Sequence, residues 1–100
     1  MNLHILESAM KDLHEARGFY ERQEDWLGEY FYDSIFSDID SLHLYAGIHR
    51  KFGTYHRLLA DRFPHAIYYT VEESGDVLVW RILDLRRDPR KTAQALKRLH

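Results

Sequence analysis

The chain has no cysteine, only two prolines and five glycines, and no long apolar segment. Without cysteine it can form neither a disulfide nor a thiolate metal site, which is compatible with a reducing compartment. A helix that spans a bilayer needs about 20 consecutive apolar residues, and no run approaches that length. The first residues, MNLHILESAMKD, lack the basic flank and long apolar core of a secretory signal. These absences predict a cytoplasmic protein with no membrane partner.

What the chain does contain is enough for a folded core. Hydrophobic residues make up 45% of the 100 residues, aromatic residues 14% and charged residues 30%. A chain of this length buries about 60–70% of its unfolded surface when it folds. We therefore expect residues 1–100 to form one domain with one core that needs no disulfide or metal.

The net charge of −2 conceals an uneven distribution along the chain. Residues 1–45 contain ten acidic and three basic residues, a balance of −7, whereas residues 46–100 contain eleven basic and six acidic residues, a balance of +5. Such asymmetry is typical of a one-sided surface for a polyanion or an acidic partner. Surface helices are also commonly rich in Glu and Asp, so charge alone leaves both interpretations open.

The N-terminal half reads as a short strand followed by two helices. Leu3–Leu6 is the short apolar strand, and Ser8 is the candidate N-cap of a first helix. Its apolar stripe consists of Met10, Leu13, Ala16 and Tyr20. A second helix is predicted at Asp25–Leu44, where one apolar face contains Leu27, Phe31, Ile35, Ile39 and Leu42. Four further aromatic residues widen that face and are expected to pack under a sheet: Trp26, Tyr30, Tyr32 and Phe36.

The stretch from Thr54 to Pro89 organises the rest of the chain. Its predicted strands are Thr54–Arg62, Ala66–Glu72 and Val77–Leu85. The last of these is apolar on both faces, which predicts an interior strand covered on both sides for part of its length. We read residues 45–53 as a loop, and residues 89–99 as a short basic helix capped by Asp88. This order predicts an α+β fold, with a short N-terminal strand and a helical hairpin packed on an antiparallel sheet of three C-terminal strands, and a short C-terminal helix.

No arrangement of residues marks a metal site or a hydrolytic centre. The seven histidines are scattered, with no paired spacing on a helix, so we expect no metal and no cofactor. Asp38 and Asp40 would face opposite sides of a helix, which argues against glycosidase-type chemistry. A Ser–His–Asp set stays open, because sequence does not show which residues meet, but no motif marks a nucleophile.

Arginines are the stronger signal of a binding surface. Arg81 interrupts an otherwise apolar strand, where a buried guanidinium without a partner would be costly. It either forms a structural ion pair, for example with Asp61 or Asp84, or faces a partner. Arg86 and Arg87 follow at the strand end, and such a cluster can hold a phosphate or a carboxylate through bidentate hydrogen bonds. A solvated basic strand end is the plainer alternative.

Four segments give the sequence a resemblance to a known family: DLHEARGFYERQ, LGEYFYDSI, RLLADRFPHAIYY and VWRILDLRRDP. Together they resemble the ParE/RelE toxins of bacterial type II toxin–antitoxin modules, which serve plasmid stabilization. The resemblance covers nearly the whole chain and implies the same α+β order of elements. It also implies a growth-inhibiting role and a small acidic antitoxin as the cognate partner, wrapped around the toxin by a segment that folds on binding.

The resemblance leaves two activities open. ParE-like members poison DNA gyrase by binding it, whereas RelE-like members cleave mRNA on the ribosome. The ribonuclease members use basic residues of the sheet and often a tyrosine in the C-terminal segment. Arg57 and Arg87 match those positions, whereas Leu59, Ala66 and Ala93 do not.

For the ribonuclease alternative, His56 or His65 would have to supply the acid or base, which makes His56, Arg57 and Arg87 the catalytic candidates. The missing residues favour a ParE-like gyrase inhibitor, or a degenerate toxin that only binds its antitoxin. A net charge of −2 also suits a ribosome binder poorly. In every case we expect a partner to contact four arginines: Arg62, Arg81, Arg86 and Arg87. Whether the chain forms a homodimer stays open.

Overall fold

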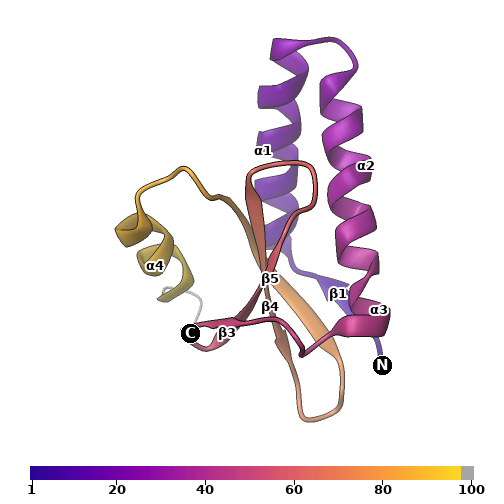
Figure 1. Ribbon diagram of the computed structural model, residues 1–100, viewed down its shortest axis with the longest axis vertical. Helices are drawn as coiled ribbons and strands as arrows, with labels where there is room; N and C mark the ends of the chain where they lie inside the picture. The colour runs from indigo at the N-terminus through magenta and orange to yellow at the C-terminus, as the bar shows by residue number, and fades with distance from the viewer. Residues whose placement is uncertain (98–100) are drawn as a thin grey trace.

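The computed structural model describes residues 1–97, which form a five-stranded sheet with helices on both sides (Figure 1). The chain begins with β1 (Leu3–Ile5), the helical hairpin α1 (Glu7–Gln23) and α2 (Leu27–Asp40), and the single turn α3 (Leu42–Tyr45). It continues through β2 (Lys51–Phe52), β3 (Tyr55–Leu59), β4 (His65–Val71), β5 (Val77–Asp84) and α4 (Pro89–Lys97). The predicted α+β class is confirmed.

The sheet has the strand order β1-β5-β4-β3-β2. β1 pairs in parallel with β5, from Leu3 opposite Val77 to Ile5 opposite Val79, and the remaining pairs are antiparallel. The three long strands lie where they were predicted, although β3 ends at Leu59, three residues earlier than expected, and β5 is an interior strand as expected. The prediction of a loop over residues 45–53 was wrong at β2, because a strand of two residues is too short to show a pattern. Gly53, at a φ of 64°, makes the tight turn from β2 into β3.

The main core lies between the sheet and the α1–α2 hairpin. α1 contributes Leu13 and Tyr20, α2 contributes Phe31 and Ile35, and all are buried against the sheet. The sheet residues on this face include Ile67, Tyr69, Val77, Val79 and Ile82. The helical stripes read from the sequence therefore mark the faces that pack.

A second, smaller core covers the other face of the sheet under α4. Tyr55, Tyr68 and Leu83 point to this face and pack with Leu96 of α4. The Tyr55 hydroxyl donates a hydrogen bond to the Leu96 carbonyl oxygen at 3.1 Å. α4 begins as predicted, with the Asp88 carboxylate accepting from the Arg90 backbone N–H at 2.9 Å, while its predicted end at residue 99 lies outside the described residues.

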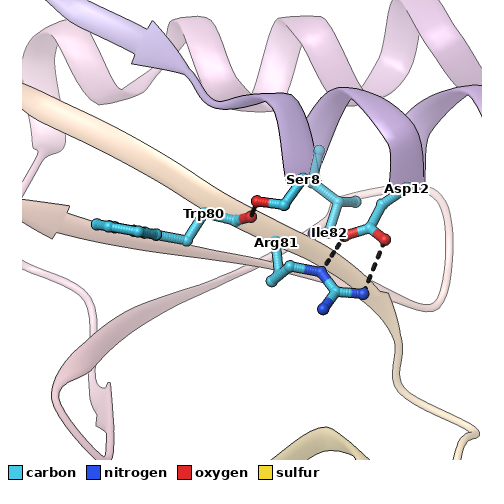
Figure 2. A network of polar contacts seen from close by, with 5 residues as sticks. All are labelled: Ser8, Asp12, Trp80, Arg81 and Ile82. Atoms are coloured by element: carbon cyan, nitrogen blue, oxygen red, sulfur yellow. Dashed lines mark hydrogen bonds and ion pairs between the residues drawn. The ribbon is translucent and has the colours of Figure 1, made fainter. Parts of the chain in front are cut away.

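The outer edge of β5 is covered by side chains of α1 (Figure 2). β1 pairs only with Val77–Val79, so β5 continues past it without a neighbouring strand on that side. The Ser8 hydroxyl donates to the Trp80 carbonyl oxygen at 2.5 Å, and the Asp12 carboxylate accepts from the Ile82 backbone N–H at 2.9 Å. Ser8 is thus not the predicted N-cap, since Leu6 occupies that position. Its hydroxyl satisfies the exposed strand edge instead.

The tip of the hairpin departs from the sequence prediction. The second helix begins at Leu27 and breaks at Ser41, whose hydroxyl donates back to the Asp38 carbonyl oxygen. Two of the aromatic residues expected in the core are on the surface, since Trp26 is 60% exposed and Tyr30 is 40% exposed. The hairpin extends beyond the sheet (Figure 1), so its far end has no layer to pack against.

Gly28 holds the two helices together near that tip. A Cβ atom at this position would lie 2.7 Å from the Arg17 carbonyl oxygen. The Gly28 backbone N–H donates to the Glu21 carboxylate at 2.9 Å. A glycine in the first turn of a helix usually costs little, but at Gly28 the backbone of α2 approaches α1 too closely for a side chain.

Candidate partner-binding cleft

Two of the arginines selected from the sequence meet beside α4. Arg57 extends from β3 and Arg87 follows β5, and both line a cleft of about 70 Å³. Phe52, Tyr68 and Thr92 complete much of its wall. The Arg57 guanidinium lies over the Phe52 ring, 5.5 Å from its centroid, which holds the side chain in place. Two arginines that line one cleft suit a carboxylate or a phosphate.

An acidic residue at the edge of the cleft is already neutralised. The Asp84 carboxylate accepts from the Arg86 guanidinium at 2.6 Å and from the Arg86 backbone N–H at 2.8 Å. These hydrogen bonds lower the pKa of Asp84 to about 2. Asp84 is therefore ionised at neutral pH and paired with Arg86, which leaves Arg57 and Arg87 to a ligand.

His56 does not join these arginines, although it precedes Arg57 in the sequence. Successive side chains of a strand point to opposite faces of the sheet. The His56 ring stacks on Tyr69 in the helix-covered layer, with 5.1 Å between centroids, and its Nδ1 lies 2.7 Å from the His49 carbonyl oxygen. The three residues predicted as a catalytic set, His56, Arg57 and Arg87, are thus not brought together.

His65, the alternative acid or base, is buried at the start of β4. It is 4% exposed and lies against the rings of Tyr20 and Phe31, at 5.9 and 5.0 Å. Burial lowers the pKa of His65, which keeps the ring neutral at pH 7. His65 and Arg87 both line a larger cleft of about 340 Å³ on the α1 side, but Arg57 does not reach it.

The four residues predicted to contact a partner have different surroundings. Arg81 forms a structural ion pair, with Nε and Nη2 at 2.7 and 3.0 Å from the carboxylate oxygens of Asp12 (Figure 2). The partner is neither of the two acids suggested by the sequence. The Arg81 side chain is 21% exposed and the Asp12 side chain is 10% exposed, so the pair stabilises the fold and offers little surface to a partner.

Arg62 and Arg86 remain accessible, but they do not share one site. Arg86 is 61% exposed and bound to Asp84. Arg62 lies beyond the end of β3, since the strand ends at Leu59 and not at the predicted residue 62. Its guanidinium lies 5.8 Å from the centroid of the Tyr30 ring on α2. Sequence reasoning missed three residues of the cleft wall: Phe52, Tyr68 and Thr92. The separation of His56 from Arg57 could have been predicted, because side chains alternate between the two faces of the sheet along β3.

The described residues also define what else the fold can hold. Within residues 1–97, no group of three His, Asp or Glu side chains lies close enough to bind a metal ion. No helix in this part of the chain is long and apolar enough to cross a membrane. The cleft itself presents two arginines beside aromatic and hydroxyl side chains.

Comparison with known proteins agrees with the fold. The family model described as "ParE toxin of type II toxin-antitoxin system, parDE" matches residues 3–89. No curated protein sequence matches the chain significantly. A solved structure, "Chromosomal ParDE TA system from P. aeruginosa", is similar with a TM-score of 0.77 and 16% sequence identity, and the match covers 86% of this chain and 97% of that chain.

Proposed function

Since this chain belongs to the ParE toxin family of type II toxin–antitoxin systems, we propose that it inhibits growth by binding DNA gyrase and that it does not cleave RNA. The observation that supports this choice is the separation of His56 from Arg57 and Arg87. RNA cleavage requires a proton donor or acceptor within reach of the groups that hold the phosphate. Here the histidine stacks on Tyr69 on the far side of the sheet from the arginine cleft.

His65 is a poor substitute for His56 in an RNA-cleaving site. Its Nδ1 is enclosed and has no hydrogen-bond partner among the described residues, and the residue as a whole is 4% exposed. A general acid or base must reach the substrate directly or through one water molecule. The ring packed between Tyr20 and Phe31 fits a structural role.

The parDE family context supplies an antitoxin as the partner, and we propose that it contacts the arginine cleft. Arg57 and Arg87 both line the cleft and suit an acidic side chain, and Arg86, which is paired with Asp84, lies exposed at the same strand end. Charge reversal with Arg86→Glu and Arg87→Glu together should weaken antitoxin binding at least about tenfold, because like charges then face each other. Arg90→Glu is the matched control, since Arg90 is 91% exposed on α4. Unchanged affinity in the double variant would place the antitoxin elsewhere.

Pulse-labelling of DNA and protein synthesis after induction of this chain alone tests the target. A gyrase inhibitor stops DNA synthesis first, and the purified chain should inhibit DNA supercoiling by gyrase. His56→Ala should keep that inhibition, because the ring stacks on Tyr69 and contacts the His49 carbonyl oxygen on the face of the sheet away from the arginine cleft. Protein synthesis that stops first, together with loss of toxicity in both His56→Ala and Arg57→Ala, would instead establish the interferase activity. Absence of any inhibition would leave a degenerate toxin that only binds its antitoxin.

A further inference from the structure

The far end of the α1–α2 hairpin exposes two large aromatic side chains. Trp26 is 60% exposed and Tyr30 is 40% exposed, and their rings lie 6.0 Å apart. Trp side chains are largely buried in most folded proteins, and Trp and Tyr are enriched at the centres of protein interfaces. The helical pattern predicts both in the core, so the pattern itself does not account for their exposure.

Most of the charged side chains near this aromatic pair are acidic, although Arg62 lies over the Tyr30 ring, 5.8 Å from its centroid. Residues 21–29 contain four acidic residues and one basic residue. A cleft of about 350 Å³ lies between the end of α1 and Trp26, and its wall includes three exposed acids, Glu21, Glu24 and Asp25, and one exposed base, Arg22. We call Glu24, Asp25, Trp26 and Tyr30 the hairpin tip. Its chemistry is an aromatic face beside two carboxylates.

The hairpin tip is held in a fixed position. Tyr30 packs against Phe63, with 5.6 Å between ring centroids. The close approach at Gly28 and its hydrogen bond to Glu21 join α1 to α2 directly next to Trp26. Figure 1 shows that the hairpin projects past the sheet, away from α4. Side chains presented on a rigid element lose little entropy when they bind.

We propose that the hairpin tip docks onto a basic protein surface, of the kind that otherwise binds nucleic-acid phosphate. This inference rests on the proposed function, because an enzyme that acts on DNA must present Lys and Arg side chains to the phosphates. An Arg or Lys of the target lies over the Trp26 ring, and neighbouring cations pair with Glu24 and Asp25. The balance of −7 in residues 1–45 draws the hairpin toward such a surface. The target and the antitoxin then use different surfaces of the toxin.

An arginine peptide tests this recognition without depending on gyrase. N-acetyl-hexaarginine amide is titrated into the ¹⁵N-labelled chain at low salt and followed by NMR. The largest shifts should occur at the Trp26 indole N–H and at the Glu24 and Asp25 amides. Trp26→Ala should weaken the affinity roughly two- to fivefold, the range of an exposed cation–π contact. Tyr45→Ala, at a residue 52% exposed on α3, is the matched aromatic control and should change nothing.

Two further measurements separate this inference from the proposed function. Glu24→Gln with Asp25→Asn should weaken peptide binding, whereas Asp33→Asn with Asp40→Asn, exposed acids elsewhere on α2, should weaken it less. Shifts spread evenly over the acidic helices, or equal affinity in Trp26→Ala, would overturn the docking surface. So would a loss of antitoxin affinity in Trp26→Ala, which would assign the hairpin tip to the antitoxin. A wild-type chain that binds the peptide as expected but does not inhibit gyrase would refute the proposed target alone.

Discussion

Replacing Asp12 with alanine should destabilise this fold more than the loss of an ion pair on the helix surface. The Asp12 carboxylate accepts two hydrogen bonds from the Arg81 guanidinium (Figure 2) and a third from the Ile82 backbone N–H. Asp12→Ala leaves a guanidinium that is 21% exposed without a partner and uncovers the edge of β5. It therefore removes the contact that joins α1 to the second half of that strand.

The magnitude follows from the burial of the pair. Removing one member of a buried ion pair costs about 3–5 kcal/mol, because the other charge stays in the protein without compensation. The unsatisfied Ile82 N–H adds to this cost by about 1–3 kcal/mol unless water reaches it. We expect a total of about 3–5 kcal/mol, since Arg81 is partly exposed and can turn toward solvent. For a domain of this size, each 1 kcal/mol lowers the Tm by about 4–8 °C.

Urea unfolding followed by circular dichroism measures this cost. Asp12→Asn keeps an oxygen that can accept from Ile82 and loses the charge, so it should cost less than Asp12→Ala. Glu29→Ala is the matched control, because the Arg17–Glu29 pair on the helix surface is 41% and 64% exposed and should contribute at most about 1 kcal/mol. If Asp12→Ala costs no more than this control, the reasoning about the covered strand edge is refuted.

Three other outcomes follow from local geometry. Gly28→Ala should destabilise the chain by about 1–3 kcal/mol, because the new Cβ atom would meet a backbone carbonyl of α1. Gly18→Ala should instead stabilise the chain by about 0.5–1 kcal/mol, because its Cβ atom would meet only the flexible end of a side chain at 3.3 Å. Urea titrations of the two variants test this contrast. NMR titration should place the pKa of Asp84 at about 2, and Arg86→Ala should return that pKa toward 3.8. The stability that the Asp84–Arg86 pair contributes is present above pH 3.8 and is lost as the pH falls toward 2. Burial lowers the pKa of His65 below 6.5 in the folded chain, so on acidification the unfolded chain binds a proton at a higher pH than the folded chain does. The folded state should therefore lose stability as the pH drops below 6.5. A urea midpoint that depends equally on pH in the His65→Leu variant would contradict this.

The pairing of Arg81 shows where sequence reasoning stops. A lone arginine in an apolar strand predicts an acidic partner, and that much was readable. The partner lies 69 residues away on α1, in a half of the chain that contains ten acids, and the two nearer acids suggested by the sequence have other roles. Only the crossing of α1 over the open edge of β5 selects Asp12, and a helix-to-sheet crossing leaves no trace in local periodicity.

The hairpin aromatics show a different limit. The helical period places Trp26 and Tyr30 near the face that packs on the sheet, and it does so correctly for Phe31 and Ile35. The spacing of apolar residues shows which side of the helix faces the neighbouring layer, but it does not show how far along the helix that layer extends. Because the hairpin is longer than the sheet beneath it, the same face is buried at one end and exposed at the other.

The basic half of the chain is less uniform than its composition suggests, and this narrows the site. Arg81 is paired with Asp12, Arg86 with Asp84 and Arg90 with Asp88. Among residues 1–97, Arg57 and Arg87 form no ion pair, and they are the two that converge on the cleft beside α4. A carboxylate that approaches the cleft therefore gains most from Arg57 and Arg87, since Arg81, Arg86 and Arg90 are already paired with a carboxylate. The proposed antitoxin contact therefore depends on which of the arginines at this cleft are unpaired, and the number of arginines is a poor guide to it.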